Sequence, residues 1–394
     1  MKLTTTGIDL LEAAPKKYLG KAGKTRVAAL CHPSSASRHF KHLVSILEKN
    51  SKLVALFGPQ HGIFGETQDN MIEWQDFKDS MGRSIYSLYG ERRKPAPESL
   101  KGVELVVVDL FDVGARYYTF IYTMAYMLEV CGDLGIPVLV CDRPNPLGGN
   151  FIEGPILDLN FKSFVGLYEL PVCHGMSIGE LAQFFCSKMK KKPELRILKM
   201  KNWKRTQLYN ETGLPWTLPS PNMPAFETAV LYPGMCLLEA TSLSEGRGTT
   251  RPFELIGAPF IQWSDVEREY LKICRELKLT PAILHRQGFI PTFHKHKGEL
   301  CFGALQVVEN PKKFHPLKHA TILLWILRKL YGNQWKWKDP PYEYEYEKLP
   351  IDILAGNTHL RDCVDGGLPL KNLFKEWKSD EERFKKLRRP YLLY

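Results

Sequence analysis

The sequence predicts an α/β protein with two parts: a Rossmann-like N-terminal domain built on a parallel sheet, and a smaller α+β C-terminal domain. A length of 394 residues corresponds to about two average domains. Short apolar runs alternate with helical patterns up to about residue 200, which is typical of βαβ units and a parallel sheet. The pattern then changes, and we expect the two domains to comprise residues 1–232 and 233–394.

The expected strands of the N-terminal domain are five short, mainly apolar runs: 26–30, 53–57, 103–110, 137–141 and 195–200. Three segments between them carry apolar residues at helical spacing and are expected to be helices: 36–48, 119–134 and 177–190. Ser177 and Glu180 have the spacing of a capping box, which indicates where the last of these helices begins.

A long segment rich in Pro, Gly, Ser and Thr, residues 213–259, follows these units. No regular element fits most of it, and its Trp, Phe, Met and Leu residues favour a packed functional loop over a flexible linker. The rest of the chain is expected to form the second domain, with helices near 265–277, 317–330 and 373–387 and a strand near 300–309.

The composition is that of a folded globular protein, with 44% hydrophobic and 25% charged residues, and it excludes a disordered or collagen-like chain. The longest apolar run, 320–327, is far shorter than the roughly 20 residues of a membrane-spanning helix. Asp9 and Glu12 interrupt what would be the apolar part of a signal peptide. We therefore expect a cytoplasmic protein that does not associate with a membrane.

The formal net charge of +11, with 54 Lys and Arg against 43 Asp and Glu, could serve nucleic acid, an anionic membrane or a small acidic ligand. The two basic runs, 188–192 and 385–389, are short and lie at the ends of expected helices, where cations offset the helix dipole. Because no helix-turn-helix, zinc-finger or RNA-binding signature occurs, we expect no nucleic-acid partner. No feature of the sequence indicates an oligomeric state.

Neither a metal ion nor a nucleotide cofactor is expected. The nine cysteines include no C-x-x-C pair, and the spacing of His294, His296 and Cys301 matches no structural zinc site. The glycines after the second expected strand lack the G-x-G-x-x-G spacing of dinucleotide sites, and no Walker loop occurs. The G-x-S-x-G elbow of α/β-hydrolases is absent as well.

Polar side chains follow three of the expected strands, and we expect them to form one ligand-binding crevice. Parallel strands end at the same edge of a sheet, and ligands bind outside that edge. The candidates are Gln60 and His61 after the second strand, Asp112, Arg116 and Tyr117 after the third, and Asn145 after the fourth. A cation beside aromatic rings suits an acidic or planar ligand. Asp109 and Asp142 are equally well explained as caps of the turns that follow them.

A second cluster of ionisable and hydroxyl groups lies within residues 244–254, SEGRGTTRPFE. Its two glycines would allow the backbone to approach a ligand closely. We take Glu245 as a candidate catalytic residue and Arg247, Arg251 and Glu254 as candidate substrate-binding residues. Alternatively, the two arginines neutralise the two glutamates in a buried loop, and both interpretations can hold because such pairing also orients a catalytic carboxylate.

With these segments the chain resembles the bacterial exo-β-N-acetylmuramidase (NamZ-like) family, long catalogued as a family of unknown function. The resemblance extends from about residue 26 to the final Tyr-Leu-Leu-Tyr. Its motifs are, in order, FGPQHGIFGE, YSLYG, DVGARYYTF, DRPNPLGG, EGPILD, SFVG, HGMSIGELA, TGLPW, PSPNMP, LYPG and SEGRGTTRPFE. So many long motifs in one order make the match specific.

The resemblance implies a Rossmann-like N-terminal domain, a smaller C-terminal domain and an active cleft between them. It also implies an enzyme that releases N-acetylmuramic acid (MurNAc) from the non-reducing end of peptidoglycan fragments such as MurNAc-GlcNAc, in cell-wall turnover and recycling, and we expect that enzyme to need no metal ion. The lactyl carboxylate of that sugar gives a reason for Arg116, Arg247, Arg251 or His174 in the cleft. Asn222, in the PSPNMP motif, completes the expected substrate-binding set.

One position departs from the family pattern. Family members commonly carry a glutamate, a catalytic candidate in the family, where this chain has Gln60, and an amide cannot exchange a proton as a carboxyl does. Glycoside hydrolysis normally uses two carboxyls that flank the bond. We expect Glu245, together with Glu66 or Asp112, to supply them, and Gln60 to bind the sugar through its amide.

Two alternatives to a glycosidase stay open at this point. A chain that has lost the family glutamate could bind an amino sugar or muropeptide without cleaving it. A different enzyme class on the same scaffold, acting on phosphosugars or nucleotide sugars, is the second alternative, because a fold does not determine the chemistry it carries.

Overall fold

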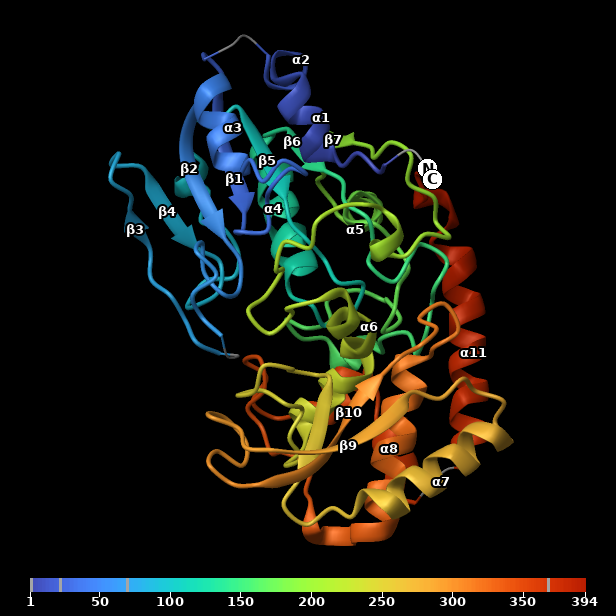
Figure 1. Cartoon of the computed structure of the whole chain (residues 1–394). Coiled ribbons are helices and arrows are strands. Elements are labelled where there is room, and N and C mark those ends of the chain that lie inside the picture. Colours follow the sequence, from blue (N-terminus) through green and yellow to red (C-terminus); the bar gives the residue numbers. More distant parts are fainter. Residues whose placement is uncertain (1–2, 21–22, 69–70, 367–368) are drawn as a thin grey trace.

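The computed structural model describes residues 3–20, 23–68, 71–366 and 369–394, which form two β-sheets and the helices around them (Figure 1). The larger sheet has the strand order β3-β4-β2-β1-β5-β6-β7. Its strands are β1 (Arg26–Cys31), β2 (Lys52–Gly58), β3 (Phe77–Lys78), β4 (Ser84–Ser87), β5 (Leu105–Asp109), β6 (Val138–Cys141) and β7 (Leu195–Leu198).

All neighbouring strands of the larger sheet are parallel except β3 and β4. The five strands predicted from apolar runs are confirmed as β1, β2, β5, β6 and β7. The sequence does not reveal β3 and β4, because they are short and Ile85 is their one buried residue. The strand order reverses between β1 and β5, and in doubly wound sheets ligands bind in the crevice at that point, outside the carboxyl ends of the strands.

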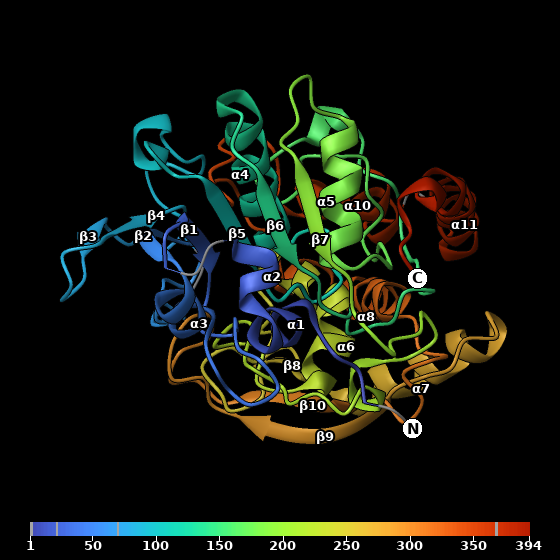
Figure 2. The ribbon, with the colours of Figure 1, turned by 90° about the horizontal axis from the view of Figure 1, so that it is seen from above.

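Helices cover both faces of this sheet (Figure 2). On one face lie α4 (Phe120–Leu134) and α5 (Ile178–Ser187), and on the other α1 (Gly7–Ala13), α2 (Pro15–Leu19) and α3 (Leu43–Asn50). α4 and α5 confirm two predicted helices, and Ser177 and Glu180 form the predicted capping box at the start of α5. The sequence pattern does not reveal α1 and α2.

The helix predicted for residues 36–48 begins only at Leu43. The residues before it form turns in which serine side chains bond to the backbone, as when the Ser37 hydroxyl accepts from the Lys41 amide at 3.3 Å. His42 then caps α3 by accepting a hydrogen bond from the amide of Val44. Serine side chains compete with helical hydrogen bonds in this way, which explains the late start.

The smaller sheet is antiparallel, in the order β8-β10-β9. Its strands are β8 (Leu255–Ala258), β9 (Ile283–Phe289) and β10 (Cys301–Val307). The helices of this half are α6 (Phe226–Met235), α7 (Trp263–Glu276), α8 (Pro316–Tyr331), α9 (Pro350–Ala355), α10 (His359–Val364) and α11 (Leu370–Leu387). Elements β10, α7, α8 and α11 confirm the predictions for this half, whereas β9, α9 and α10 are additional.

Six short 3-10 helices complete the described elements: Pro97–Leu100, Leu159–Phe161, Tyr209–Glu211, η4 (Cys236–Ala240), Gly332–Gln334 and Arg389–Tyr391.

The prediction that residues 213–259 contain almost no regular structure is wrong for their second half, which forms α6, η4 and β8. Pro233 and Gly234 discourage a helix in isolation. Here nine of the ten residues of α6 are buried, so tertiary packing stabilises the helix in spite of its low propensity. A Cβ at Gly234 would lie 1.9 Å from the Pro316 carbonyl oxygen, so α6 and α8 can approach this closely only with glycine at that position.

The last residues of the chain return from α11 to the half of the protein that contains the larger sheet (Figure 1). Three contacts hold them: Arg388 donates to the His174 carbonyl at 3.0 Å, the Leu393 amide donates to Glu180 at 2.9 Å, and the Tyr394 hydroxyl donates to Asp142 at 2.5 Å. Burial raises the pKa of Asp142 to about 7. The C-terminal segment therefore completes the hydrogen bonding of the first domain.

Candidate active site

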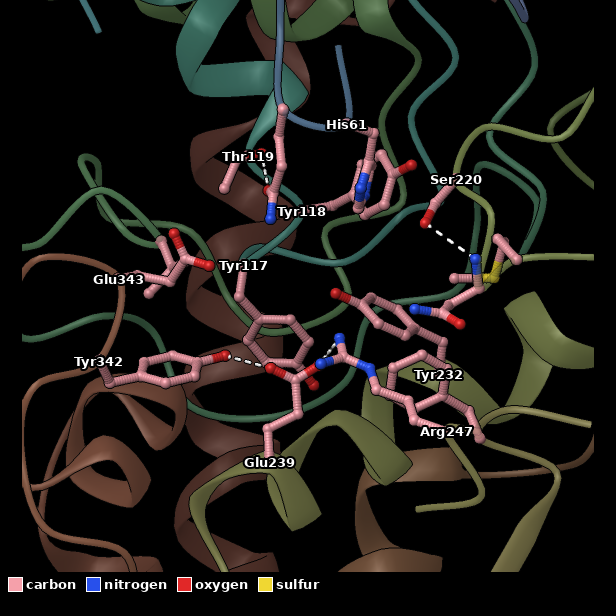
Figure 3. Close-up of a pocket in the computed structure, with 15 residues that line it drawn as sticks. His61, Tyr117, Tyr118, Thr119, Ser220, Tyr232, Glu239, Arg247, Tyr342 and Glu343 are labelled. Atoms are coloured by element: carbon pink, nitrogen blue, oxygen red, sulfur yellow. Dashed lines mark hydrogen bonds and ion pairs between the residues drawn. The ribbon is translucent and has the colours of Figure 1, made fainter. Parts of the chain in front are cut away.

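A polar pocket lies where the loops after β2 and β5 meet residues of the C-terminal half (Figure 3). Its volume is about 30 Å³, room for one or two water molecules. The lining residues are Gln60, His61, Tyr117, Tyr118, Thr119, Val165, Ser220, Asn222, Met223, Tyr232, Glu239, Arg247, Phe253, Tyr342 and Glu343. The pocket thus lies outside the carboxyl edge of the larger sheet, where the sequence predicts a ligand site.

Glu239, in η4, is the first of two carboxylates on the pocket wall. Its Oε1 accepts a hydrogen bond from Arg247 Nη2 at 2.7 Å, and its Oε2 accepts one from the Tyr342 hydroxyl at 2.7 Å (Figure 3). Both carboxylate oxygens therefore have a donor, and the ion pair with Arg247 is almost fully buried. This arrangement holds the carboxylate and the guanidinium in one orientation toward the pocket.

Glu343 is the second carboxylate, and it is 3% exposed. It lies in a tight turn closed by the backbone pair of Tyr342 and Glu345, with φ 46° at Glu343 and 67° at Tyr344. Left-handed backbone at two successive non-glycine residues is unfavourable and marks a conformation imposed by the surroundings. Burial raises the pKa of Glu343 to about 7, and the carboxylate of Glu239 contributes in the same direction.

A chain of hydrogen bonds connects the loops after β2 and β5 to Glu343. The Thr119 hydroxyl donates to Gln60 Oε1 at 2.6 Å, and Gln60 Nε2 donates to the Tyr89 oxygen at 3.1 Å. The Tyr89 hydroxyl in turn donates to the Glu343 carboxylate at 2.9 Å. The amide of Gln60, expected to contact a sugar, is therefore part of this internal chain.

Five residues proposed from the sequence line the pocket together: Gln60, His61, Tyr117, Asn222 and Arg247. His61 follows β2 with φ 75°, and its Nδ1 donates to the Thr67 carbonyl at 2.8 Å, which orients the ring. The Asn222 side chain donates to the Gln68 carbonyl at 2.6 Å.

Three other candidates lie at the same edge of the sheet but do not line the pocket. Asp112 accepts from the Gly114 amide at 2.9 Å, and its carboxylate is 3.3 Å from His174 Nε2. Asn145 donates to the Met176 carbonyl at 3.1 Å and packs under Gly114, where a Cβ would lie 2.4 Å from its Oδ1. These side chains support the loops that form the pocket.

Glu245 lies outside the pocket wall and is fully buried. Lys295 Nζ is 2.6 Å and His294 Nδ1 3.3 Å from its carboxylate, and Arg247 Nε is 3.9 Å away. Burial alone would raise the pKa of Glu245, but the interactions with Lys295, His294 and Arg247 outweigh it and hold the pKa well below its usual range. A carboxylate so strongly held in its charged form is suited to orienting Arg247 and the loop around it.

The remaining candidates also have partners within the protein. Arg116 is fully buried and donates to three backbone carbonyls. Arg251 pairs with Glu254 at 2.9 Å, as the sequence suggested, and the arginine side chain is 54% exposed. Glu66 is exposed and accepts from the Phe64 amide at 3.1 Å. Among the substrate-binding arginines proposed from the sequence, Arg247 is the one that lines the pocket.

The sequence interpretation missed Glu239, Glu343, Tyr89 and Tyr342. One signal was present: the alternation of tyrosine and glutamate in residues 342–346 (YEYEY) is unusual beside two prolines, yet it fits neither a helix nor a buried strand. Glu239 gives no comparable signal. Its approach to Glu343 depends on how η4 packs against a turn that lies about a hundred residues later in the chain.

Within the described part of the chain, no group of three or more His, Cys, Asp or Glu side chains is arranged to hold a metal ion. None of the helices described is long and apolar enough to cross a membrane. All nine cysteines are buried and none forms a disulfide.

The fold and the site define a class: a two-domain α/β protein with a carboxylate-lined pocket at the carboxyl edge of a doubly wound sheet. Residues 27–227 match the family described as Exo-beta-N-acetylmuramidase NamZ, N-terminal, and residues 230–394 match its C-terminal counterpart. The chain belongs to this family, which confirms the resemblance drawn from the sequence motifs.

Individual relatives agree with this assignment. The chain is 42% identical over 392 residues to the peptidoglycan beta-N-acetylmuramidase NamZ of Bacillus subtilis, covering 99% of this chain and 91% of that protein. Among solved structures, a DUF1343 family protein of Bacteroides fragilis matches with a TM-score of 0.85 and 29% identity, over 99% of both chains. A second DUF1343 protein of that species matches with a TM-score of 0.76 and 28% identity, over 100% of this chain and 99% of the other.

Proposed function

We propose that the protein is an exo-acting β-N-acetylmuramidase that releases N-acetylmuramic acid from the non-reducing end of peptidoglycan fragments, in cell-wall turnover and recycling. The observation that carries the proposal is the presence of Glu239 and Glu343 on the wall of one pocket. Hydrolysis of a glycosidic bond normally requires two carboxyls that flank it. Glu245, Glu66 and Asp112 lie outside that wall, so we propose Glu239 and Glu343 in their place.

We further propose that the active cleft lies between the two domains, because the pocket is lined from one side by residues 60–61 and 117–119 and from the other by Glu239, Arg247, Phe253 and residues 342–343. The reaction takes place in the cytoplasm in this proposal. Nine buried thiols without a disulfide support a reducing compartment. Fractionation of cells with an antibody against the protein tests that location.

The direct test of the function is incubation of the purified protein with the disaccharide MurNAc-GlcNAc, in EDTA, beside a binding titration with the same ligand. We expect release of both monosaccharides, and we expect Gln60→Glu to keep activity because a protonated glutamate can also donate to Tyr89. A wild type that binds the disaccharide without cleaving it, but gains hydrolysis on Gln60→Glu, would instead establish an amino-sugar-binding protein whose missing carboxylate was essential.

Recognition of the lactyl carboxylate is assigned to Arg247. Its planar guanidinium carries five N–H donors, so it can hold Glu239 and bind a second carboxylate at the same time. Wild type should therefore prefer MurNAc over N-acetylglucosamine at the non-reducing end. In Arg247→Lys the charge remains but the planar fork is lost, and we expect this preference, measured as the ratio of kcat/KM values, to fall about 10-fold.

Arg251→Lys is the matched control, because Arg251 lies in the same loop but outside the pocket. The control should leave the preference unchanged. A loss of preference in Arg251→Lys, with none in Arg247→Lys, would move lactyl recognition to the exposed arginine.

A further inference from the structure

We propose that Glu343 is the proton donor of the reaction, and that Tyr89 and Gln60 are positioning residues that direct its proton toward the substrate. The inference rests on the function proposed above and deepens it by dividing the roles of the two carboxyls. It also accounts for an amide, rather than a carboxyl, at position 60.

The direction of the Tyr89 hydroxyl follows from its neighbours. A phenolic oxygen has two lone pairs and one hydrogen. Gln60 Nε2 and the Met71 amide donate to this oxygen at 3.1 and 2.9 Å, so its lone pairs are engaged. Its hydrogen is therefore directed at Glu343, whose two oxygens lie 3.0 and 2.9 Å away. An ionised glutamate at position 60 would replace one of these donors by an acceptor.

This orientation determines where a protonated Glu343 can donate. The Tyr89 hydroxyl donates to a carboxyl oxygen of Glu343 and cannot accept a further hydrogen bond. The hydrogen of a protonated Glu343 therefore has to be donated to a different acceptor. Glu343 lines the pocket and faces its interior in Figure 3. A glycosidic oxygen that takes the place of a water molecule in the pocket is then the acceptor available to that hydrogen, which is the geometry that general acid catalysis requires.

The charged surroundings distinguish the two carboxyls. Glu239 is paired with the guanidinium of Arg247 at 2.7 Å, whereas no ion pair of Glu343 is found among the described residues. The groups that act on Glu343 are Tyr89, Glu239, Arg247 and Arg93. Burial dominates over them and raises the pKa of Glu343 to about 7, so a large part of the enzyme carries its proton near neutral pH. A carboxyl that holds a proton near neutral pH, beside a second carboxyl, supplies the proton donor and the partner that a glycosidase normally uses.

In the proposed reaction one C–O bond of the substrate breaks and one C–O bond to water forms. The bond between C1 of MurNAc and the glycosidic oxygen breaks, and its electron pair stays on that oxygen. The oxygen takes the proton of Glu343, and the following sugar leaves as an alcohol. C1 gains the hydroxyl of a water molecule, and the remaining proton of that water returns to the enzyme and restores the starting state.

A comparison of two leaving groups tests the proposal. The disaccharide MurNAc-GlcNAc needs protonation of its leaving oxygen, whereas 4-nitrophenyl β-N-acetylmuraminide releases a stable anion without it. We expect Glu343→Gln to lower kcat/KM for the disaccharide about 10³-fold and for the nitrophenyl substrate less than about 10-fold. Glu347→Gln, the same change at an exposed residue of the same segment, should alter neither.

The pH profile supplies the readout for the positioning residue. Glu343 must be protonated to act, so wild-type kcat/KM for the disaccharide should fall as pH rises through about 7. The Tyr89 hydrogen bond favours the ionised carboxylate and lowers the pKa of Glu343. Tyr89→Phe should therefore shift this alkaline limb to higher pH, a change that a purely structural tyrosine would not produce.

The outcomes distinguish the proposed muramidase activity from the proposed role of Glu343 as proton donor. Equal losses on both substrates in a folded Glu343→Gln variant, or no loss on either, would overturn the role of Glu343 while the wild-type activity still supports the enzyme. A wild type inactive on both substrates would overturn the proposed function and the role of Glu343 with it.

Discussion

Replacing Glu239 by glutamine is expected to lower kcat on MurNAc-GlcNAc by about 10³-fold or more. The glutamine oxygen can still accept from Tyr342, but its amide nitrogen then faces the guanidinium of Arg247, where the wild type has a carboxylate oxygen at 2.7 Å. The pocket loses a negative charge, and Arg247 loses the partner that orients it. Steady-state kinetics on the purified variant measure the effect.

A loss of this size could also follow from damage to the fold, because breaking a buried ion pair costs about 3–5 kcal/mol. The double variant Glu239→Gln with Arg247→Met separates the two causes. Removing both charges should restore much of the free energy of unfolding, while turnover stays low. Near-normal turnover in Glu239→Gln would contradict its assignment and return Asp112 to consideration as the second carboxyl.

The second large effect is expected from Arg116→Met, which should lower the free energy of unfolding by about 3–5 kcal/mol. The guanidinium donates to the Pro155 and Leu170 carbonyls at 2.9 Å each and to the Leu354 carbonyl at 2.7 Å. Methionine fills a similar volume but removes the guanidinium donor from all three buried carbonyls, of which the Leu170 carbonyl keeps one other donor, the Leu157 amide at 3.0 Å. Denaturant unfolding measures the loss.

Two further variants test the explanation. Arg251→Met removes an arginine whose side chain is 54% exposed, and it should cost less than about 1 kcal/mol. Gly356→Ala should destabilise the protein without removing any donor, because its Cβ would lie 2.8 Å from Arg116 Nη2 and φ there is 83°. If Arg116→Met unfolds at the wild-type denaturant concentration, the guanidinium does not contribute to stability in this way.

The sequence predicted the elements whose signals are local. Five apolar runs predicted strands correctly, because both faces of a parallel sheet are covered by helices; these strands are β1, β2, β5, β6 and β7. The spacing of Ser177 and Glu180 is sufficient to predict the start of a helix. The sequence pattern did not predict α6, because Pro233 and Gly234 have low helix propensity. Packing of α6 against α8 compensates for this low propensity in the folded protein.

The site residues likewise divide into those that local sequence patterns predicted and those that depend on tertiary packing. Gln60, His61 and Tyr117 could be proposed because the carboxyl ends of parallel strands share one edge. Residues 244–254 looked catalytic because they are rich in ionisable groups, but most of those groups have partners within the protein, as Glu245 has Lys295. Composition does not distinguish charges that face a substrate from charges that face each other. That distinction depends on the packed structure, which also brings Glu239 and Glu343 to one pocket.

The contacts of Arg388, Leu393 and Tyr394 with the first domain bear on folding during synthesis. The ribosome releases the larger sheet and its helices long before these residues emerge, and domains generally begin to fold in that order. Until then Asp142 lacks the hydrogen bond that it accepts from the Tyr394 hydroxyl, and Glu180 lacks the one that it accepts from the Leu393 amide. The nascent first domain therefore lacks these hydrogen bonds until residues 388–394 have been synthesised, and native contacts this distant in sequence slow the final folding step.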